Sequence, residues 1–181
     1  MISKSNSPLL RSVRFSLLAA GLMLVVLFSG CYSFKDVSIP PEVKTARVNY
    51  LENKARYINP QLSPQLTEKL RQKINNQTRL TLVQNDDAHY DISGYVSDYS
   101  VTTSGISQQG NQQQASMNRL TVTVTLVFKN NLDPTKNFEA PISRNFEFSA
   151  NLSLQQAEAQ LSETIIQNLT DEIFNRIFSN W

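Results

Sequence analysis

The chain has 181 residues, with 17 Lys and Arg against 15 Asp and Glu, one Cys and one His. This length corresponds to one domain, and a hydrophobic content of 40% is enough for a single core. The lone cysteine excludes an intrachain disulfide. With a single histidine beside it, the chain also lacks the soft ligands of a structural zinc site.

The first thirty residues have the pattern of a bacterial secretion signal. Residues 1–14 carry three basic residues and no acid, and an apolar run from Phe15 to Gly30 follows. This run is shorter than the roughly 20 residues that a membrane-spanning helix needs. We therefore expect residues 1–30 to be a signal peptide.

The end of the apolar run resembles a lipobox, the motif in which small residues precede a cysteine that becomes a lipidated N-terminus. Its residues are Leu27, Phe28, Ser29, Gly30 and Cys31. Phe28 stands where leucine is commoner, but the lone cysteine is at the place that this chemistry requires. The alternatives are an ordinary signal peptide with an incidental cysteine, or an uncleaved anchor. We expect Cys31 to carry a covalent lipid that holds the protein on a membrane, and we expect no other cofactor.

The first predicted elements are a short extended tether over residues 31–42 and the start of a single domain over 43–181. The tether ends in two prolines, which disfavour a helix. Alternation over 43–50 then predicts a strand with one buried face. The residues expected on that face are Ala46, Val48 and Tyr50.

An amphipathic helix follows, with Ser63 as its expected N-cap and Pro64 at its first position. Its apolar stripe consists of Leu66, Leu70 and Ile74. Residues 80–101 then alternate, and we interpret them as one strand that is interrupted near Asp86 and Asp87.

Residues 102–118 are rich in glutamine and predict a flexible loop, because they offer almost nothing to bury. The alternating segments 120–128 and 142–148 predict an antiparallel hairpin. Arg144 falls in phase with the apolar side of the second strand. Either the register breaks after Pro141, or the guanidinium meets an anion or a carboxylate.

The chain closes with a long helix that begins at a capping box, Ser153 to Gln156, and carries apolar residues at steps of four. The resulting order is β-α-β-β-β-α. We therefore predict a two-layer α+β fold, with a mixed four-stranded sheet and both helices on one face.

Catalytic chemistry has one weak candidate. Asp87, His89 and Asp91 alternate, so an extended chain would point them the same way, as a metal site or an acid–base enzyme requires. The simpler interpretation, a solvated turn that leads into a strand, is preferred because no nucleophile or further ligand can be placed nearby. We expect no catalytic residue, no metal site and no nucleic-acid partner.

Charge is divided along the chain. Residues 35–79 hold nine Lys/Arg and four Asp/Glu, a net charge of +5, whereas residues 80–181 hold five and eleven, a net charge of −6. Without the signal peptide the charges sum to −1, so the formal value of +2 for the whole chain is misleading.

Several segments together resemble one family. CYSF, IPPEVKTARVNYLENKARYINPQLSPQLTEKLRQKINNQTRLTLV, NRLTVTVTLVFKNNLDPTKNFE and EIFNRIFSNW are similar to the lipopolysaccharide-assembly lipoprotein LptE of the Bacteroidota type. The resemblance implies two helices on a four-stranded sheet. It also implies a non-enzymatic lipoprotein on the periplasmic side of the outer membrane, which partners the LptD β-barrel, assists its assembly, plugs it and supports lipopolysaccharide insertion.

Two further expectations follow from the resemblance and the charge pattern. The basic residues Lys69, Arg71, Lys73 and Arg79 are candidates for a patch that binds lipopolysaccharide phosphates or acidic groups of the barrel. The alternative function is that of a generic outer-membrane lipoprotein, a pilot or scaffold of another envelope assembly.

Overall fold

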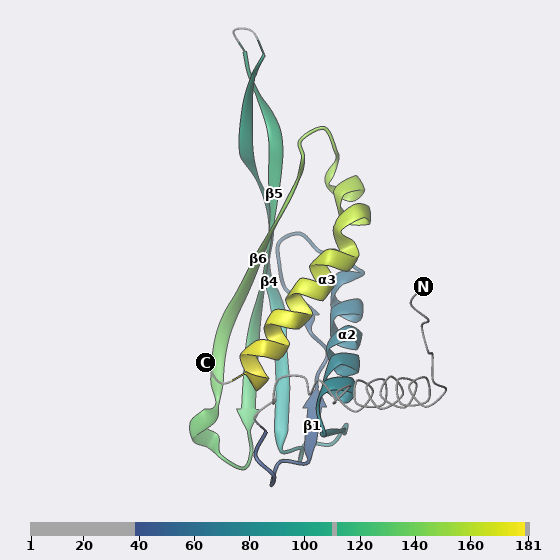
Figure 1. Ribbon diagram of the computed structural model, residues 1–181, viewed down its shortest axis with the longest axis vertical. Helices are drawn as coiled ribbons and strands as arrows, with labels where there is room; N and C mark the ends of the chain where they lie inside the picture. Colours follow the sequence, from purple (N-terminus) through teal and green to yellow (C-terminus); the bar gives the residue numbers. More distant parts are fainter. Residues whose placement is uncertain (1–38, 110–111, 180–181) are drawn as a thin grey trace, which may run out of the picture. The chain divides into compact units, whose positions relative to one another are not determined.

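The computed structural model describes residues 39–109 and 112–179. The signal peptide, the lipobox, Cys31 and most of the expected tether lie outside these residues. Within them the strands form one sheet in the order β3-β1-β4-β5-β6, and β2 pairs with β4 beside this path (Figure 1). The expected four-stranded sheet therefore has additional short strands, while the mixed α+β class is confirmed.

The parallel half of the sheet is built around β1 (Thr45–Val48). Both β3 (Thr81–Leu82) and β4 (Tyr90–Gln109) pair with β1 in parallel, on opposite sides, and β2 (Glu52–Asn53) pairs in parallel with β4. The prediction of one interrupted strand over 80–101 is wrong. A bulge shifts the register by about one residue, whereas the polar segment between β3 and β4 is long enough to carry the chain across β1.

The antiparallel half consists of β4, β5 (Gln112–Asn130) and β6 (Phe138–Ser149), with the short 3-10 helix η1 (Pro134–Lys136) between the last two strands. The predicted hairpin is confirmed. The predicted loop over 102–118 is corrected, because β4 and β5 stay paired as far as Gln109 and Gln112. Pairing satisfies the backbone N–H and C=O groups without burying side chains, so polar residues can continue the ribbon.

The two helices are α2 (Leu62–Gln77) and α3 (Leu154–Phe178). The capping box of α3 is confirmed: the Gln156 side chain accepts from the N–H of Ser153 at 2.9 Å, and the N–H of Gln156 donates to Ser153 Oγ at 3.3 Å. Ser63 is not the N-cap of α2. The helix begins two residues earlier than expected, with Gln61 as its N-cap and Leu62 as its first residue, and it has no side-chain cap.

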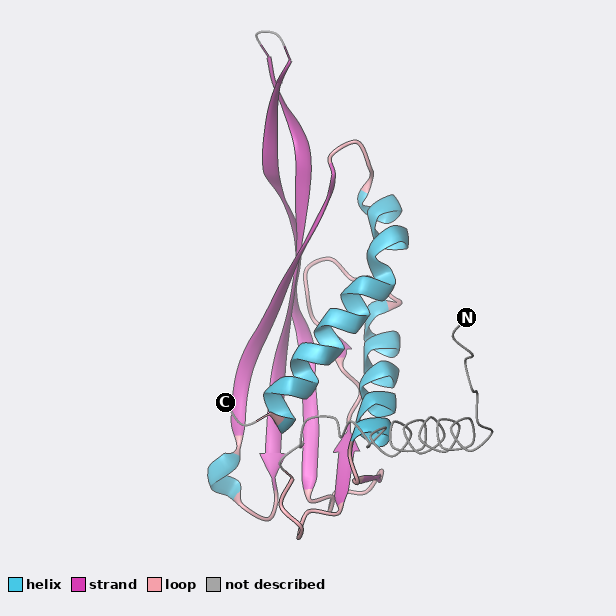
Figure 2. Cartoon of the chain, in the orientation of Figure 1, coloured by secondary structure: helices cyan, strands magenta, loops and turns pink. Residues whose placement is uncertain are grey.

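Both helices cover the same face of the sheet, as Figure 2 shows. The core between the layers is formed by alternate strand residues and by the inner stripes of the helices, including Ala46, Val48, Ile92, Val96, Leu120, Val122, Val124, Leu126, Leu66, Leu70, Ile74, Leu169 and Ile173. Tyr50 was expected on this face but is 54% exposed, because β1 ends at Val48 and Leu51 takes the buried place instead.

Candidate functional site

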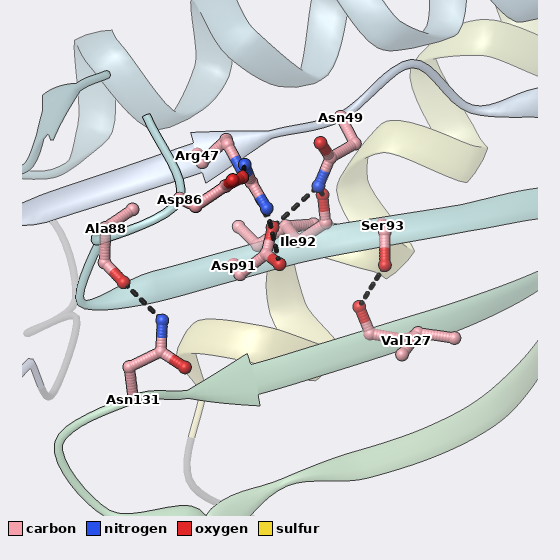
Figure 3. A network of polar contacts seen from close by, with 9 residues as sticks. All are labelled: Arg47, Asn49, Asp86, Ala88, Asp91, Ile92, Ser93, Val127 and Asn131. Carbon is pink, nitrogen blue, oxygen red and sulfur yellow. Dashed lines mark hydrogen bonds and ion pairs between the residues drawn. The ribbon is translucent and has the colours of Figure 1, made fainter. Parts of the chain in front are cut away.

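A polar network joins β1 to β4 on the face of the sheet that no helix covers (Figure 3). Arg47 and Asp91 are directly opposite each other in the parallel pair. The guanidinium donates to both carboxylate oxygens, with Nε–Oδ1 at 3.1 Å and Nη2–Oδ2 at 3.0 Å. Asn49 Nδ2 donates to Asp91 Oδ1 at 2.6 Å, and Asp86 also contacts the guanidinium. The two ion-pair side chains are only 18% and 13% exposed.

The electrostatics of this network keep both groups charged. Partial burial alone would raise the pKa of Asp91, but the hydrogen bonds from Arg47 and Asn49 outweigh it and hold this pKa below its usual value. Hydrogen bonds to Asp91 and Asp86 raise the pKa of Arg47. A carboxylate that is held ionised and already accepts three hydrogen bonds is suited to structural pairing rather than to proton transfer.

The row of Asp87, His89 and Asp91 does not converge on one point. His89 Nδ1 accepts a hydrogen bond from the backbone N–H of Lys44 at 3.0 Å, whereas Asp91 is held by the network and Asp87 is exposed. Over residues 39–109 and 112–179, no three His, Cys, Asp or Glu side chains are grouped so that they could hold a metal ion. The described geometry thus gives no support to the enzyme alternative.

The predicted cations of α2 face two different partners. Lys69 Nζ lies 3.3 Å from Glu163, and Lys73 Nζ lies 2.8 Å from Asp171, so both pair with α3. Lys73 also lies 5.0 Å above the ring of Phe174. These contacts bind α2 to α3.

The two arginines of the predicted patch are engaged elsewhere. Arg71 donates to the carbonyl oxygen of Val48 from Nε at 3.2 Å and from Nη2 at 2.8 Å. Arg79 donates to the carbonyl of Ile39. The structure therefore does not bring the four cations into one patch. Three cations of the basic first third, Arg47, Lys69 and Lys73, form ion pairs with acidic residues of the rest of the chain.

A cluster around Glu158 has no signal in the sequence, because its members come from distant segments. The carboxylate of Glu158 accepts from Tyr99 Oη at 2.7 Å, from Asn59 Nδ2 at 3.0 Å and from Tyr57 Oη at 3.2 Å. The two tyrosine rings stack with centroids 5.3 Å apart. Burial and the neighbouring carboxylate raise the pKa of Tyr99. This cluster fixes the segment before α2 against α3 and β4.

The helix-free face is rich in hydroxyl groups along β5, and Asp98 of β4 lies directly opposite Thr123 on this face. On β5 it presents Thr121 and Thr123, whose hydroxyls donate to Asn145 Oδ1 at 2.9 Å and Ser143 Oγ at 3.1 Å on β6. The open face of an antiparallel sheet is expected to carry polar residues.

The structure decides between the two alternatives for Arg144, a break of the strand register after Pro141 or a guanidinium that meets an anion or a carboxylate. The register between β5 and β6 continues through Pro141 without a shift, so Arg144 remains on the helix side of the sheet. Its guanidinium meets the carboxylate of Glu172 on α3. The second alternative, a partner carboxylate, is therefore correct.

The hollow between the helices is shallow. It has a volume of about 400 Å³, and the pair Lys69–Glu163 contributes to its lining together with Glu68 and Ile166. Among the described helices none is long and apolar enough to cross a membrane.

Comparisons with solved structures concern the fold. A protein from Xanthomonas campestris is 10% identical, with 77% of this chain and 88% of that chain covered and a TM-score of 0.50. A minor lipoprotein from Acinetobacter baumannii is 18% identical, with 78% and 95% covered and a TM-score of 0.48. The rare lipoprotein B from Shewanella oneidensis is 15% identical, with 74% and 90% covered and a TM-score of 0.37.

Family membership comes from the sequence. A search of curated proteins found no match. The family model described as "LptE: Lipopolysaccharide-assembly" matches residues 43–177, which include every strand of the sheet, all of α2 and all but the last residue of α3. The chain therefore belongs to the LptE lipopolysaccharide-assembly family.

Proposed function

We propose that this protein is an outer-membrane lipoprotein, anchored by a lipid on Cys31 and facing the periplasm, that partners an LptD-type β-barrel. It assists assembly of the barrel, plugs it and supports insertion of lipopolysaccharide into the outer membrane. The observation that carries the proposal is the family match over residues 43–177. The chain's lone cysteine, at the end of a lipobox-like segment, supports the anchor.

The chemistry of the domain favours binding over catalysis. The titratable side chains of the Arg47 network and the Glu158 cluster are committed to contacts within the fold. The helix-free face offers short hydroxyl and amide side chains, such as Thr121, Thr123 and Asn145. The interior of an outer-membrane barrel is polar, so a face of this kind suits such a partner.

The barrel is the first partner in this proposal, ahead of the phosphates of lipopolysaccharide. Lys69 and Lys73 would have to give up their ion pairs with α3 before they could bind a phosphate. Each such exchange costs the favourable energy of the existing pair.

Affinity purification of the tagged protein from membranes, with identification of what co-purifies, tests the proposal. The wild-type protein should be lipidated and should recover an LptD-type barrel. The Cys31→Ser variant is the matched control, because it leaves the described domain unchanged and should be lost from the membrane fraction. Recovery of a secretion channel or another envelope complex in place of the barrel would favour the pilot or scaffold alternative.

A further inference from the structure

Strand β6 is the long unprotected edge of the sheet. The strand order ends at β3 on one side and at β6 on the other. Natural proteins protect edges with short strands and bulges. Accordingly, the edge strand β3 has only two residues. Strand β4 is also an edge after Val96, where its pairing with β2 ends, and its register with β5 shifts in that part. In contrast, β6 has 12 residues and pairs with β5 from Phe138 to Ser149 with no shift (Figure 1).

The direction of the β6 backbone groups follows from two independent observations. The N–H of Ala150 donates to the carbonyl oxygen of Ser116 at 3.1 Å, one position beyond the pair Ser149–Met117. In an antiparallel pair, hydrogen-bonded and non-hydrogen-bonded positions alternate. The even-numbered residues of β6 therefore bond to β5. Pro141 has no N–H and stands at an odd-numbered position in an unbroken register, which agrees with this assignment.

The odd-numbered residues consequently direct their N–H and C=O groups away from the sheet. Pro141 interrupts the row of donors, and Ser143, Asn145 and Glu147 follow it without another gap. All three of these residues are exposed. The side chains of Ser143 and Asn145 accept hydrogen bonds from threonines of β5, so they lie over the sheet and leave the backbone edge clear.

We propose that the edge formed by Ser143, Asn145 and Glu147 binds an extended segment of the partner polypeptide, which adds a strand to the sheet. The inference rests on the proposed function, in which the partner is the barrel protein. Main-chain hydrogen bonds supply the affinity in this mode of recognition, and they require only an extended backbone in the partner. The donor missing at Pro141 sets one end of the paired segment.

A second copy of this chain fits the edge less well. Antiparallel self-pairing centred on Ser143 would place Glu139 opposite Glu147, and pairing centred on Arg144 would place that residue opposite itself. In every register, two copies that pair only along this short edge bury far less surface area than the roughly 1,200 Å² of a stable protein interface. A barrel that also contacts the helix-free face supplies the additional area.

Proline and alanine substitutions at the same positions test the proposal in the full-length, lipidated protein. The double variant Ser143→Pro/Asn145→Pro removes outward donors and leaves the ladder to β5 intact, as Pro141 does in the natural chain. Recovery of the barrel should fall by about 25-fold, since each net hydrogen bond contributes roughly a factor of five. The variant Ser143→Ala/Asn145→Ala loses the same two side chains but keeps both N–H groups, so it should recover clearly more barrel than the proline pair. Glu139→Pro places a proline on the same edge outside the segment and should behave as the wild type.

Amide hydrogen exchange of the wild-type protein, resolved to single residues, is independent of whether a proline variant folds. In the isolated protein the amides of Ser143, Asn145 and Glu147 should exchange faster than those of Arg144 and Phe146. In the barrel complex they should become protected by at least about tenfold.

The outcomes separate the inference from the proposed function. If the wild type recovers the barrel but the amides stay unprotected, or the proline pair recovers as much barrel as the alanine pair, the strand addition is wrong and the proposed function stands. Protection that grows with concentration in the isolated protein assigns the edge to a second copy and overturns the inference. If the wild type recovers no barrel, both proposals fail.

Discussion

Replacing Asp91 with asparagine measures what the network on the helix-free face contributes to folding. The change keeps the size of the side chain and removes its charge. The pair loses a bidentate interaction at 3.1 and 3.0 Å between side chains that are 18% and 13% exposed. Breaking a buried pair costs about 3–5 kcal/mol. Asp86 still contacts Arg47 in the variant, so we expect a loss of about 2 kcal/mol in the free energy of unfolding, or about 6 °C in Tm.

Urea denaturation at pH 7 checks this value, with Asp98→Asn as the control. Asp98 lies on the same strand and accepts from Ser100 Oγ at 2.7 Å, and no ion pair of Asp98 is found within residues 39–109 and 112–179. Its replacement should cost less than about 0.5 kcal/mol. Equal losses in the two variants would refute the account of the network.

The same pair predicts a pH dependence. Because the pKa of Asp91 is lowered in the folded protein, the unfolded chain binds more protons around the ordinary carboxyl value of about 3.9. The stabilisation is therefore present above that value and is lost as the pH falls through the folded pKa. The difference between wild type and Asp91→Asn should narrow when unfolding is measured below about pH 4. A difference that stayed constant to pH 3 would contradict the assigned cause.

Three other substitutions test separate parts of the fold. Gly94→Ala should cost at least about 2 kcal/mol by urea denaturation, because a Cβ there would collide with the carbonyl oxygen of Thr125; an unchanged midpoint would contradict this packing. Ser153→Ala should cost about 1 kcal/mol through the lost cap of α3, with no change in the slope of the denaturation curve. Glu158→Gln should lower the pKa of Tyr99 in an ultraviolet titration, since Glu158 adds to the effect of burial; an unchanged titration would show that burial acts alone.

Local patterns predicted the elements whose stability is local. The four-residue spacing of Leu66, Leu70 and Ile74 identified α2, because all three must face the sheet. The pair Ser153 and Gln156 identified the start of α3, since both hydrogen bonds of a capping box form within one turn. Alternation identified β5 and β6.

The features that the sequence did not predict, the division of 80–101 into two strands and the partners of the basic residues, depend on contacts between distant segments. The division of 80–101 into β3 and β4 depends on pairing with β1, about forty residues earlier. The fate of the basic residues was hidden for the same reason: Lys69 and Lys73 find Glu163 and Asp171 almost one hundred residues away. A charge pattern along a chain cannot distinguish an ion pair inside the domain from a free patch on its surface.

The most direct test of the central claim is the amount of newly made lipopolysaccharide at the cell surface when this protein is depleted and then restored. Depletion should reduce the amount of newly made lipopolysaccharide that reaches the cell surface, so that it accumulates within the envelope. Wild-type protein should restore surface arrival, and the Cys31→Ser variant should not. Undiminished arrival of lipopolysaccharide after complete depletion would contradict a role in its assembly.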